Sequence, residues 1–305
     1  MNRRNFLQQS TLTGTGLLLS SLNSIAMAQT IQLPADFDLK ILATNWGYDG
    51  NWDSFCSKVK TEGYDGVELW LPGDEKDKNE MMAAIKKYNL NYGFLCAGHQ
   101  ADFTSHFETF KKNLRLAMVL KPLYINCHSG RDYFSFEDNK RLIEYSIATS
   151  KETGVPVYHE THRSRILFAA HIAKQFIEKI PGLRLTLDIS HWCNVHESLL
   201  ADQEETVNMA LQRADHIHAR IGHQEGPQVN DPRAPEWEKT VAAHLNWWDK
   251  IVENKIKTGN KKLTILTEFG PPNYLPTLPY TQQPVADQWA INVHMMNLLR
   301  KRYKS

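Results

Sequence analysis

Short runs of apolar, strand-forming residues alternate along the chain with longer stretches in which apolar residues recur every three or four positions. The short runs have the length and composition of buried strands. There are eight of them: Leu39–Thr44, Gly66–Trp70, Asn91–Ala97, Leu123–His128, Val157–Glu160, Leu185–Asp188, His216–Arg220 and Leu263–Phe269. The stretches that follow them predict amphipathic helices at Trp52–Glu62, Lys78–Lys87, Phe107–Leu120, Asp138–Glu152, Ile166–Lys179, Glu204–Arg213, Thr240–Lys257 and Val285–Arg300.

This alternation predicts an α/β fold of one kind. Each strand and its helix together span roughly 25 to 45 residues, the size of a βα unit with a helical crossover. No glycine-rich phosphate loop follows any strand, which argues against an open doubly wound sheet. Eight units without a linker between them predict a single (β/α)8 TIM barrel.

The first 28 residues are expected to be an export signal. The pair Arg3-Arg4 precedes a weakly apolar run and then Ala26-Met27-Ala28, which together resemble a twin-arginine signal peptide with an Ala-x-Ala cleavage site. Polar residues interrupt the apolar run, and it is shorter than the roughly 20 residues of a membrane-spanning helix. We therefore expect a periplasmic protein with no stable membrane anchor after cleavage, and one barrel domain over residues 29–305.

Charge and cysteine content exclude several function classes. The chain has 35 Lys and Arg against 34 Asp and Glu, a net charge of +1, so it lacks the basic excess typical of nucleic-acid binding. The cysteines have no CxxC spacing, which argues against a zinc knuckle or a thioredoxin-type site. We expect mainly free, semi-buried thiols at Cys56, Cys96, Cys127 and Cys193.

A polar or chargeable residue stands at the carboxyl end of seven consecutive predicted strands, from the second to the eighth. These residues are Glu68, His99, His128, Glu160, Asp188, His218 and Glu268. A carboxylate or imidazole at the end of a buried strand needs a partner or water, and in a barrel all strand ends converge on one mouth. The three carboxylates and one histidine of the last four strands therefore predict a mixed oxygen and nitrogen site for a divalent ion.

Four motifs contain these last residues: Tyr158-His159-Glu160-Thr161-His162, Leu187-Asp188-Ile189-Ser190-His191, His216-Ile217-His218-Ala219-Arg220 and Leu266-Thr267-Glu268-Phe269-Gly270. They resemble the strand-end motifs of the xylose isomerase-like barrel superfamily, which includes sugar isomerases, ketose 3-epimerases, inosose dehydratases and endonuclease IV. The resemblance implies one divalent metal held by Glu160, Asp188, His218 and Glu268. It also implies that His191 touches the substrate.

The resemblance implies a division of chemical labour as well. In the isomerase and epimerase branch two glutamates on opposite sides of the bound sugar act as base and acid, and these would be Glu160 and Glu268. The reaction would pass through an enediolate, while His191 and Arg220 would orient the substrate oxygens. His216, on the same side of its strand as His218, is expected to support that residue.

Two loops supply planar donors suited to sugar hydroxyls. Arg163 follows the first metal-site motif, and the 16-residue irregular segment Gly222–Trp237 contains Gln228, Arg233 and Trp237. Irregular loops of this length inside a compact barrel are usually functional. All four side chains are therefore predicted to bind the substrate, a neutral or oxidised sugar or a glycoside.

Four functions stay open on the sequence alone. We favour a divalent-metal-dependent sugar isomerase or epimerase that removes a proton next to a carbonyl. The same enolising site suits a dehydratase or lyase acting on 3-keto-glycosides or inososes. An endonuclease IV-like phosphodiesterase fits poorly with a near-neutral charge, and the fourth function is sugar binding without catalysis.

The expected cofactor is one divalent ion. Three carboxylates and an imidazole favour Mn²⁺ or Mg²⁺, and Co²⁺ and Zn²⁺ are compatible with the same ligands. The expected partners are a small sugar or keto-sugar and no nucleic acid. The superfamily often forms dimers or tetramers, so the resemblance is compatible with a homo-oligomer.

Overall fold

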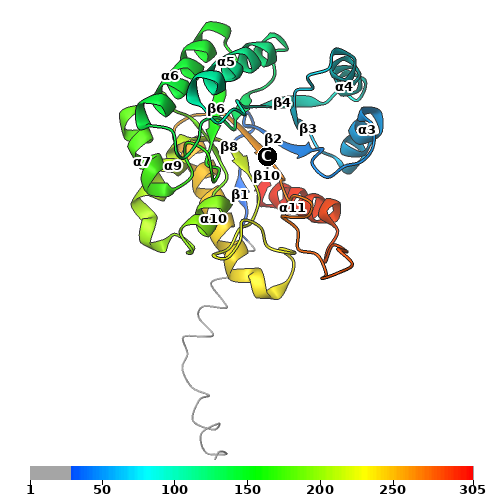
Figure 1. Cartoon of the computed structure of the whole chain (residues 1–305). Coiled ribbons are helices and arrows are strands. Elements are labelled where there is room, and N and C mark those ends of the chain that lie inside the picture. Colours follow the sequence, from blue (N-terminus) through cyan, green and yellow to red (C-terminus); the bar gives the residue numbers. More distant parts are fainter. Residues whose placement is uncertain (1–28, 305) are drawn as a thin grey trace, which may run out of the picture.

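Eight parallel strands close into a barrel in the computed structural model, which describes residues 29–304 (Figure 1). In barrel order they are β2 (Asp38–Thr44), β3 (Gly66–Trp70), β4 (Asn91–Cys96), β5 (Ile125–Cys127), β6 (Val157–Glu160), β7 (Leu185–Leu187), β8 (Ala214–His218) and β9 (Lys262–Leu266). The last strand pairs with the first, with Leu42 opposite Leu266. The predicted (β/α)8 barrel is confirmed.

Helices between successive strands form a ring around this barrel (Figure 1). They are α3 (Trp52–Glu62), α4 (Glu75–Lys87), α5 (Phe103–Val119), α6 (Phe136–Thr153), α7 (Ala170–Lys179), α8 (Ser190–Val195), α9 (Glu204–Arg213), α10 (Glu238–Lys257) and α11 (Gln288–Arg302), with short 3-10 turns η1 (Ala201–Gln203) and η2 (Pro235–Trp237). Several begin at a residue whose side chain accepts a hydrogen bond from the first turn, namely Asn51, Asp74, Asp102, Ser135 and Asp287.

The structure differs from the sequence prediction mainly at element ends. Helix α4 begins three residues before the predicted start because its first turn, Glu75–Asp77, is charged and gives no apolar period. The segment 166–169 precedes α7 instead of belonging to it. Helix α8 was not predicted, since six residues are too few to show a helical period.

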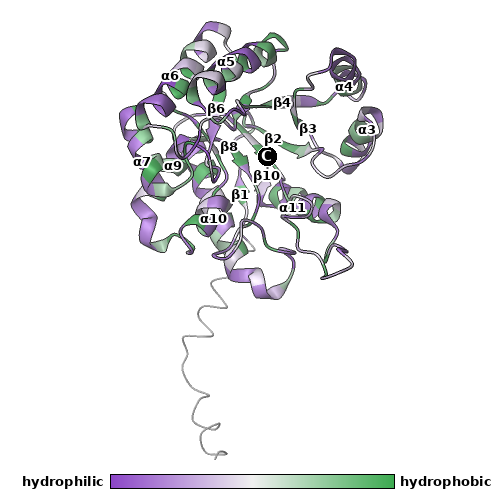
Figure 2. Cartoon of the chain, viewed as in Figure 1, coloured by the Kyte–Doolittle hydropathy of each residue, from purple (hydrophilic) through white to green (hydrophobic). Residues whose placement is uncertain are grey.

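The barrel interior is more polar than the usual layers of Val, Ile and Leu. A small apolar layer of Leu42, Tyr124 and Leu266 is separate from the main core that lies between strands and helices. Glu68 and His216 are fully buried beside it. Hydrophobic residues mark the strands and the barrel-facing sides of the helices in Figure 2. The four cysteines are buried and free, as expected.

The two ends of the described chain meet beneath the barrel. Strand β1 (Ile31–Gln32) pairs in parallel with β10 (Tyr303–Lys304), which follows α11. Asp249 of α10 accepts hydrogen bonds from Arg302 Nε at 2.7 Å and from the Tyr303 hydroxyl at 3.0 Å. The Arg302 and Asp249 side chains are 2% and 5% exposed. A buried ion pair therefore fixes the carboxyl-terminal segment against α10.

The predicted export signal, residues 1–28, lies outside the described residues. Among the helices that the structure does describe, none combines the length and apolarity needed to cross a membrane.

We expect Asp249→Ala to lower the free energy of unfolding by about 3–5 kcal/mol, because it removes the carboxylate paired with a buried guanidinium. Urea denaturation followed by circular dichroism measures this change. Asp53→Ala is the control, since the ion pair of Asp53 with Lys87 is more than half exposed and is expected to contribute little. Equal denaturation midpoints for Asp249→Ala and the parent protein would contradict the prediction.

Candidate metal and substrate site

Four acidic and histidine side chains from the last four barrel strands meet at one rim. Glu160 and His218 are the last residues of β6 and β8, and Asp188 and Glu268 stand just beyond β7 and β9. Their ligand atoms all lie within 4.8 Å of one another, and all four residues are buried. The structure thus brings together the four ligands that the family resemblance implied.

The polar atoms of this group face one another without being satisfied. His218 Nδ1 lies 2.8 Å from Glu268 Oε2 and 3.6 Å from Glu160 Oε1. All three atoms are buried and lack an aligned hydrogen-bond partner. Buried polar atoms need a partner, and carboxylate oxygens with an imidazole nitrogen are ligands of divalent metals. The donor set fits such an ion by its chemistry and its unused lone pairs.

Asp188 is oriented by residues of the short helix α8 and by an arginine from beyond β8. The Ser190 backbone N–H donates to Asp188 Oδ1 at 3.1 Å, and Arg220 Nη2 donates to Asp188 Oδ2. The same Arg220 Nη2 lies 2.7 Å from His191 Nε2, and its Nη1 lies 3.5 Å from Glu268 Oε2. Arg220 thus connects two candidate metal ligands with a predicted substrate-binding histidine.

His191 lies between two guanidinium groups. Arg163 Nη1 lies 3.1 Å from His191 Nδ1, on the opposite side of the ring from Arg220. Both guanidiniums lie 4.8 Å from the ring centroid of Tyr274. Burial, together with the nearby charges of His162 and Arg220, lowers the pKa of His191 well below its usual range. His191 is therefore a neutral imidazole, fully buried and with a guanidinium group at each ring nitrogen.

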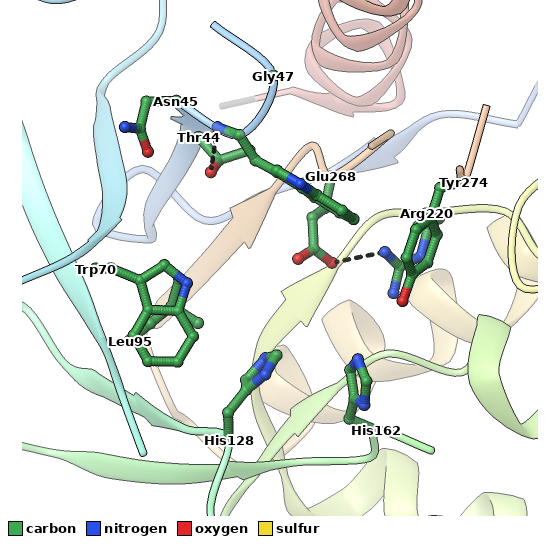
Figure 3. Close-up of a pocket in the computed structure, with 11 residues that line it drawn as sticks. Thr44, Asn45, Gly47, Trp70, Leu95, His128, His162, Arg220, Glu268 and Tyr274 are labelled. Atoms are coloured by element: carbon green, nitrogen blue, oxygen red, sulfur yellow. Dashed lines mark hydrogen bonds and ion pairs between the residues drawn. The ribbon is translucent and has the colours of Figure 1, made fainter. Parts of the chain in front are cut away.

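A cavity of about 410 Å³ opens above these residues. It is lined by Thr44, Asn45, Trp46, Gly47, Trp70, Leu95, His128, His162, Arg220, Glu268 and Tyr274. Figure 3 shows Trp70 and Leu95 on one side and Arg220 with Tyr274 on the other, with Glu268 between them. A Cβ atom at Gly270 would clash with the Trp46 ring, so glycine at this position allows that indole to line the cavity.

Two further groups of possible donors occur within residues 29–304. His128 and His162 form one with Glu160, and the Asn126 amide donates to Glu160 Oε2 at 2.8 Å. Glu68 and His216 form the other with His218, deeper in the barrel. His99 belongs to neither group, and its ring stands 6.1 Å from that of Trp70.

The pKa values of the candidate ligands are shifted in different directions by their surroundings. Burial raises the pKa of Asp188 to about 6 although Arg220 opposes the shift. Burial disfavours the His218 cation, but the carboxylates of Glu268, Glu160 and Glu68 more than compensate and raise the pKa of His218 well above its usual range. Burial likewise disfavours the Glu160 anion, yet His128 and His218 hold the pKa of Glu160 well below its usual range.

Arg220 lines the cavity, but the other five predicted substrate-binding residues are not among its lining residues: His191, Arg163, Gln228, Arg233 and Trp237. Arg233 pairs with Asp231 within its own loop, and Trp237 Nε1 donates to Asn230 at 2.6 Å. Gln228 accepts from Gly270 N at 2.7 Å and donates to Gly270 O at 3.2 Å. The loop thus uses these groups internally, and Gln228 fixes the segment just after Glu268. Substrate contact by all five residues stays a prediction.

The sequence interpretation gave no role to several residues of the site. Glu68 stood out as a strand-end carboxylate, but nothing in the sequence pairs it with a histidine 150 positions away. His162 lies two residues after Glu160, so alternation along the strand could have placed it on the same side. Tyr274 belongs to the Gly- and Pro-rich segment after β9, where only the fold directs its ring under two arginines.

Comparison with known proteins gives both a family and structural neighbours. The family model described as xylose isomerase-like TIM barrel matches residues 56–235, more than half of the chain. The 3-keto-D-glucoside 4-epimerase of E. coli has a TM-score of 0.57 at 14% identity, covering 86% of this chain and 99% of that one.

Two other solved structures are similar. The D-allulose 3-epimerase of Methylomonas sp. has a TM-score of 0.56 at 14% identity over 89% of this chain and all of that one. The probable 3-DHS dehydratase of Bacillus anthracis has a TM-score of 0.55 at 15% identity over 87% of this chain and all of that one. At such identities the likeness shows the fold alone. No curated sequence matches the chain.

The protonation of the ligands predicts how metal binding depends on pH. A metal displaces protons from its ligands, so we expect Mn²⁺ affinity to rise with pH. About one proton, from His218, should be released near neutral pH, and about two below pH 6, where Asp188 is also protonated. Titration calorimetry in buffers of different ionisation enthalpy counts these protons. An affinity that is constant between pH 5 and 8 would show that these two groups are not ligands.

Proposed function

Because the chain belongs to the xylose isomerase-like TIM barrel family, we propose that it is a divalent-metal-dependent sugar isomerase or epimerase. The observation that carries this proposal is the convergence of Glu160, Asp188, His218 and Glu268 below an open cavity. Two of these residues are glutamates, each with one buried carboxylate oxygen that has no hydrogen-bond partner. Such groups can exchange a proton with a substrate as well as hold a cation.

The acid and base of the reaction are assigned to Glu160 and Glu268. A bound divalent ion supplies Lewis acidity, which polarises a carbonyl and makes the neighbouring C–H more acidic. Glu268 lines the cavity. Glu160 does not line it, but lies next to His128 and His162, which do. One glutamate removes the α-proton to give an enediolate, and the other returns a proton to the adjacent carbon or the opposite face. Despite its burial, His128 and His218 hold the pKa of Glu160 well below its usual range, so this carboxylate is ionised, which is the form that a cation ligand and a base both require.

Arg220 and His191 bind and orient the substrate oxygens. Arg220 is held by Asp188 and rests on Tyr274, so its guanidinium is fixed before the substrate arrives. A fixed donor that faces a developing oxyanion stabilises it without further reorganisation. His191, neutral and buried, contacts Arg220 and so fixes the guanidinium that lines the cavity; its own contact with the substrate is part of the proposal.

A small polyhydroxylated ketone or a glycoside fits the remaining lining. Trp46 and Trp70 present exposed indole surface, at 37% and 44%, and aromatic faces pack against the apolar faces of sugar rings. Two structural neighbours are epimerases of a 3-keto-D-glucoside and of D-allulose, which supports this class of substrate. If residues 1–28 direct export as predicted, the reaction takes place in the periplasm.

Dehydratase or lyase activity is the second candidate, because elimination starts with the same proton removal. A probable dehydratase is among the structural neighbours. The two outcomes differ in the product, since isomerisation and epimerisation conserve mass whereas elimination releases water or an aglycone.

Solvent exchange tests the proposal. The Mn²⁺-loaded protein is incubated in D₂O with ketoses, 3-keto-glucosides and inososes, and deuterium at the α-carbon is followed by NMR and mass spectrometry. We expect Glu160→Gln and Glu268→Gln each to slow this exchange by at least about 100-fold, the contribution of general acid–base catalysis.

Glu108→Gln serves as the matched control, because Glu108 lies on the surface of α5 in a largely exposed pair with Lys111. It should exchange at the parent rate. Exchange at the parent rate in both active-site variants would refute the assignment of acid and base. Absence of metal-dependent exchange with the whole panel would instead favour sugar binding without catalysis.

A further inference from the structure

His218 is contacted by carboxylates on both sides of its ring. Its Nδ1 faces Glu268 and Glu160 at the rim, while its Nε2 lies 3.0 Å from Glu68 Oε1 deeper in the barrel. Glu68 belongs to β3 and His218 to β8, so the contact crosses the barrel interior. Glu68 and His218 are both completely buried.

The inner group differs from the rim group in being fully hydrogen-bonded. The Tyr124 hydroxyl donates to Glu68 Oε2 at 2.7 Å, and His216 Nε2 lies 3.1 Å from the same oxygen. His216 Nδ1 lies 2.7 Å from the hydroxyl of Thr264. Among the described residues, the buried atoms that lack a partner include Glu160 Oε1, His218 Nδ1 and Glu268 Oε2 but no atom of Glu68 or His216. The inner group is therefore a closed network, and the unused lone pairs point to the rim.

Glu68 is also the acceptor that His218 Nε2 requires. Asn126 Nδ2 lies 3.2 Å from His218 Nε2 and 2.8 Å from Glu160 Oε2, but an amide nitrogen only donates, so it cannot accept a proton from Nε2. A neutral imidazole carries one proton, and the hydrogen bond made by one nitrogen decides which nitrogen is free to bind a metal.

We propose that Glu68 is a positioning residue, which holds the proton of His218 on Nε2 and so directs the Nδ1 lone pair toward the metal. The inference rests on the proposed metal-dependent function, but it concerns the direction of one ligand and not the reaction. Tyr124 and His216 in turn hold the Glu68 carboxylate in place. Outer-shell carboxylates of this kind change metal affinity by about 10- to 100-fold when they are removed.

Three variants test the proposal by calorimetric titration with Mn²⁺, which needs no substrate. Glu68→Leu removes the acceptor and should weaken Mn²⁺ binding by about 10- to 100-fold. Glu68→Gln keeps an oxygen that can accept from His218 Nε2 and should restore most of the affinity. Glu108→Leu is the matched control, since it makes the same Glu-to-Leu change at a side chain that is 66% exposed on α5, away from the rim, and should bind Mn²⁺ as the parent protein does.

The outcomes separate this inference from the proposed function. Parent-like Mn²⁺ affinity in Glu68→Leu overturns the inference, and so does a Glu68→Gln variant as weak as Glu68→Leu, because charge and not hydrogen bonding would then matter. A Mn²⁺ anomalous peak between Glu68 and His216 in a crystal also overturns it. If the parent protein binds Mn²⁺ but catalyses no deuterium exchange, only the proposed function is refuted.

The histidine resonances give a second measurement if Glu68→Leu does not fold. NMR of the Zn²⁺-loaded parent protein with ¹⁵N-labelled histidine should show the metal on Nδ1 of His218 and a proton on Nε2. Glu68→Gln should give the same pattern. Zinc on Nε2 of His218 in either protein would overturn the inference.

Discussion

Four carboxylates buried around one imidazole are the constraint on which the site depends. Moving a carboxylate out of water costs several kcal/mol unless a counter-charge and hydrogen bonds compensate. Arg220 contacts Asp188 and Glu268, and His218 lies against Glu268, Glu160 and Glu68. Arg220 is a permanent cation, but the other partners of these carboxylates are titratable rings: His218, His216 beside Glu68 and His128 beside Glu160. A divalent cation at the rim would supply positive charge that does not depend on protonation of these rings, which is a physical reason, independent of the family, to expect one there.

The fold and the convergence of the four candidate ligands at the rim could be predicted because both follow from local patterns. Alternating strand and helix periods define the βα units, and closure of eight such units brings every strand end to one mouth. A chargeable residue at a strand end can therefore be predicted to lie at that mouth. The prediction works for Glu160, Asp188, His218 and Glu268 because each stands within two residues of its strand end.

Contacts that depend on register or on loop conformation could not be predicted in this way. Glu68 contacts His218 across the barrel only because the registers of β3 and β8 with their neighbouring strands place the two residues at a similar height along the barrel axis. Composition identified Arg233 and Trp237 as sugar-binding types, yet it does not reveal that Asp231 and Asn230 occupy their polar groups. Tyr274 gave no signal at all, although the fold places its ring against two guanidiniums.

The polar interior beneath the rim is better explained by function than by stability. Well-packed apolar residues can replace a buried polar network without loss of stability, and sometimes with a gain, and most barrels fill this space with Val, Ile and Leu. Here Glu68, Tyr124 and His216 fill it with hydrogen bonds that satisfy one another and leave one donor, His218 Nε2, connected to the rim. Such a network limits the rotations of the imidazole, so His218 on β8 is oriented by Glu68 on β3 and by Tyr124, the residue just before β5.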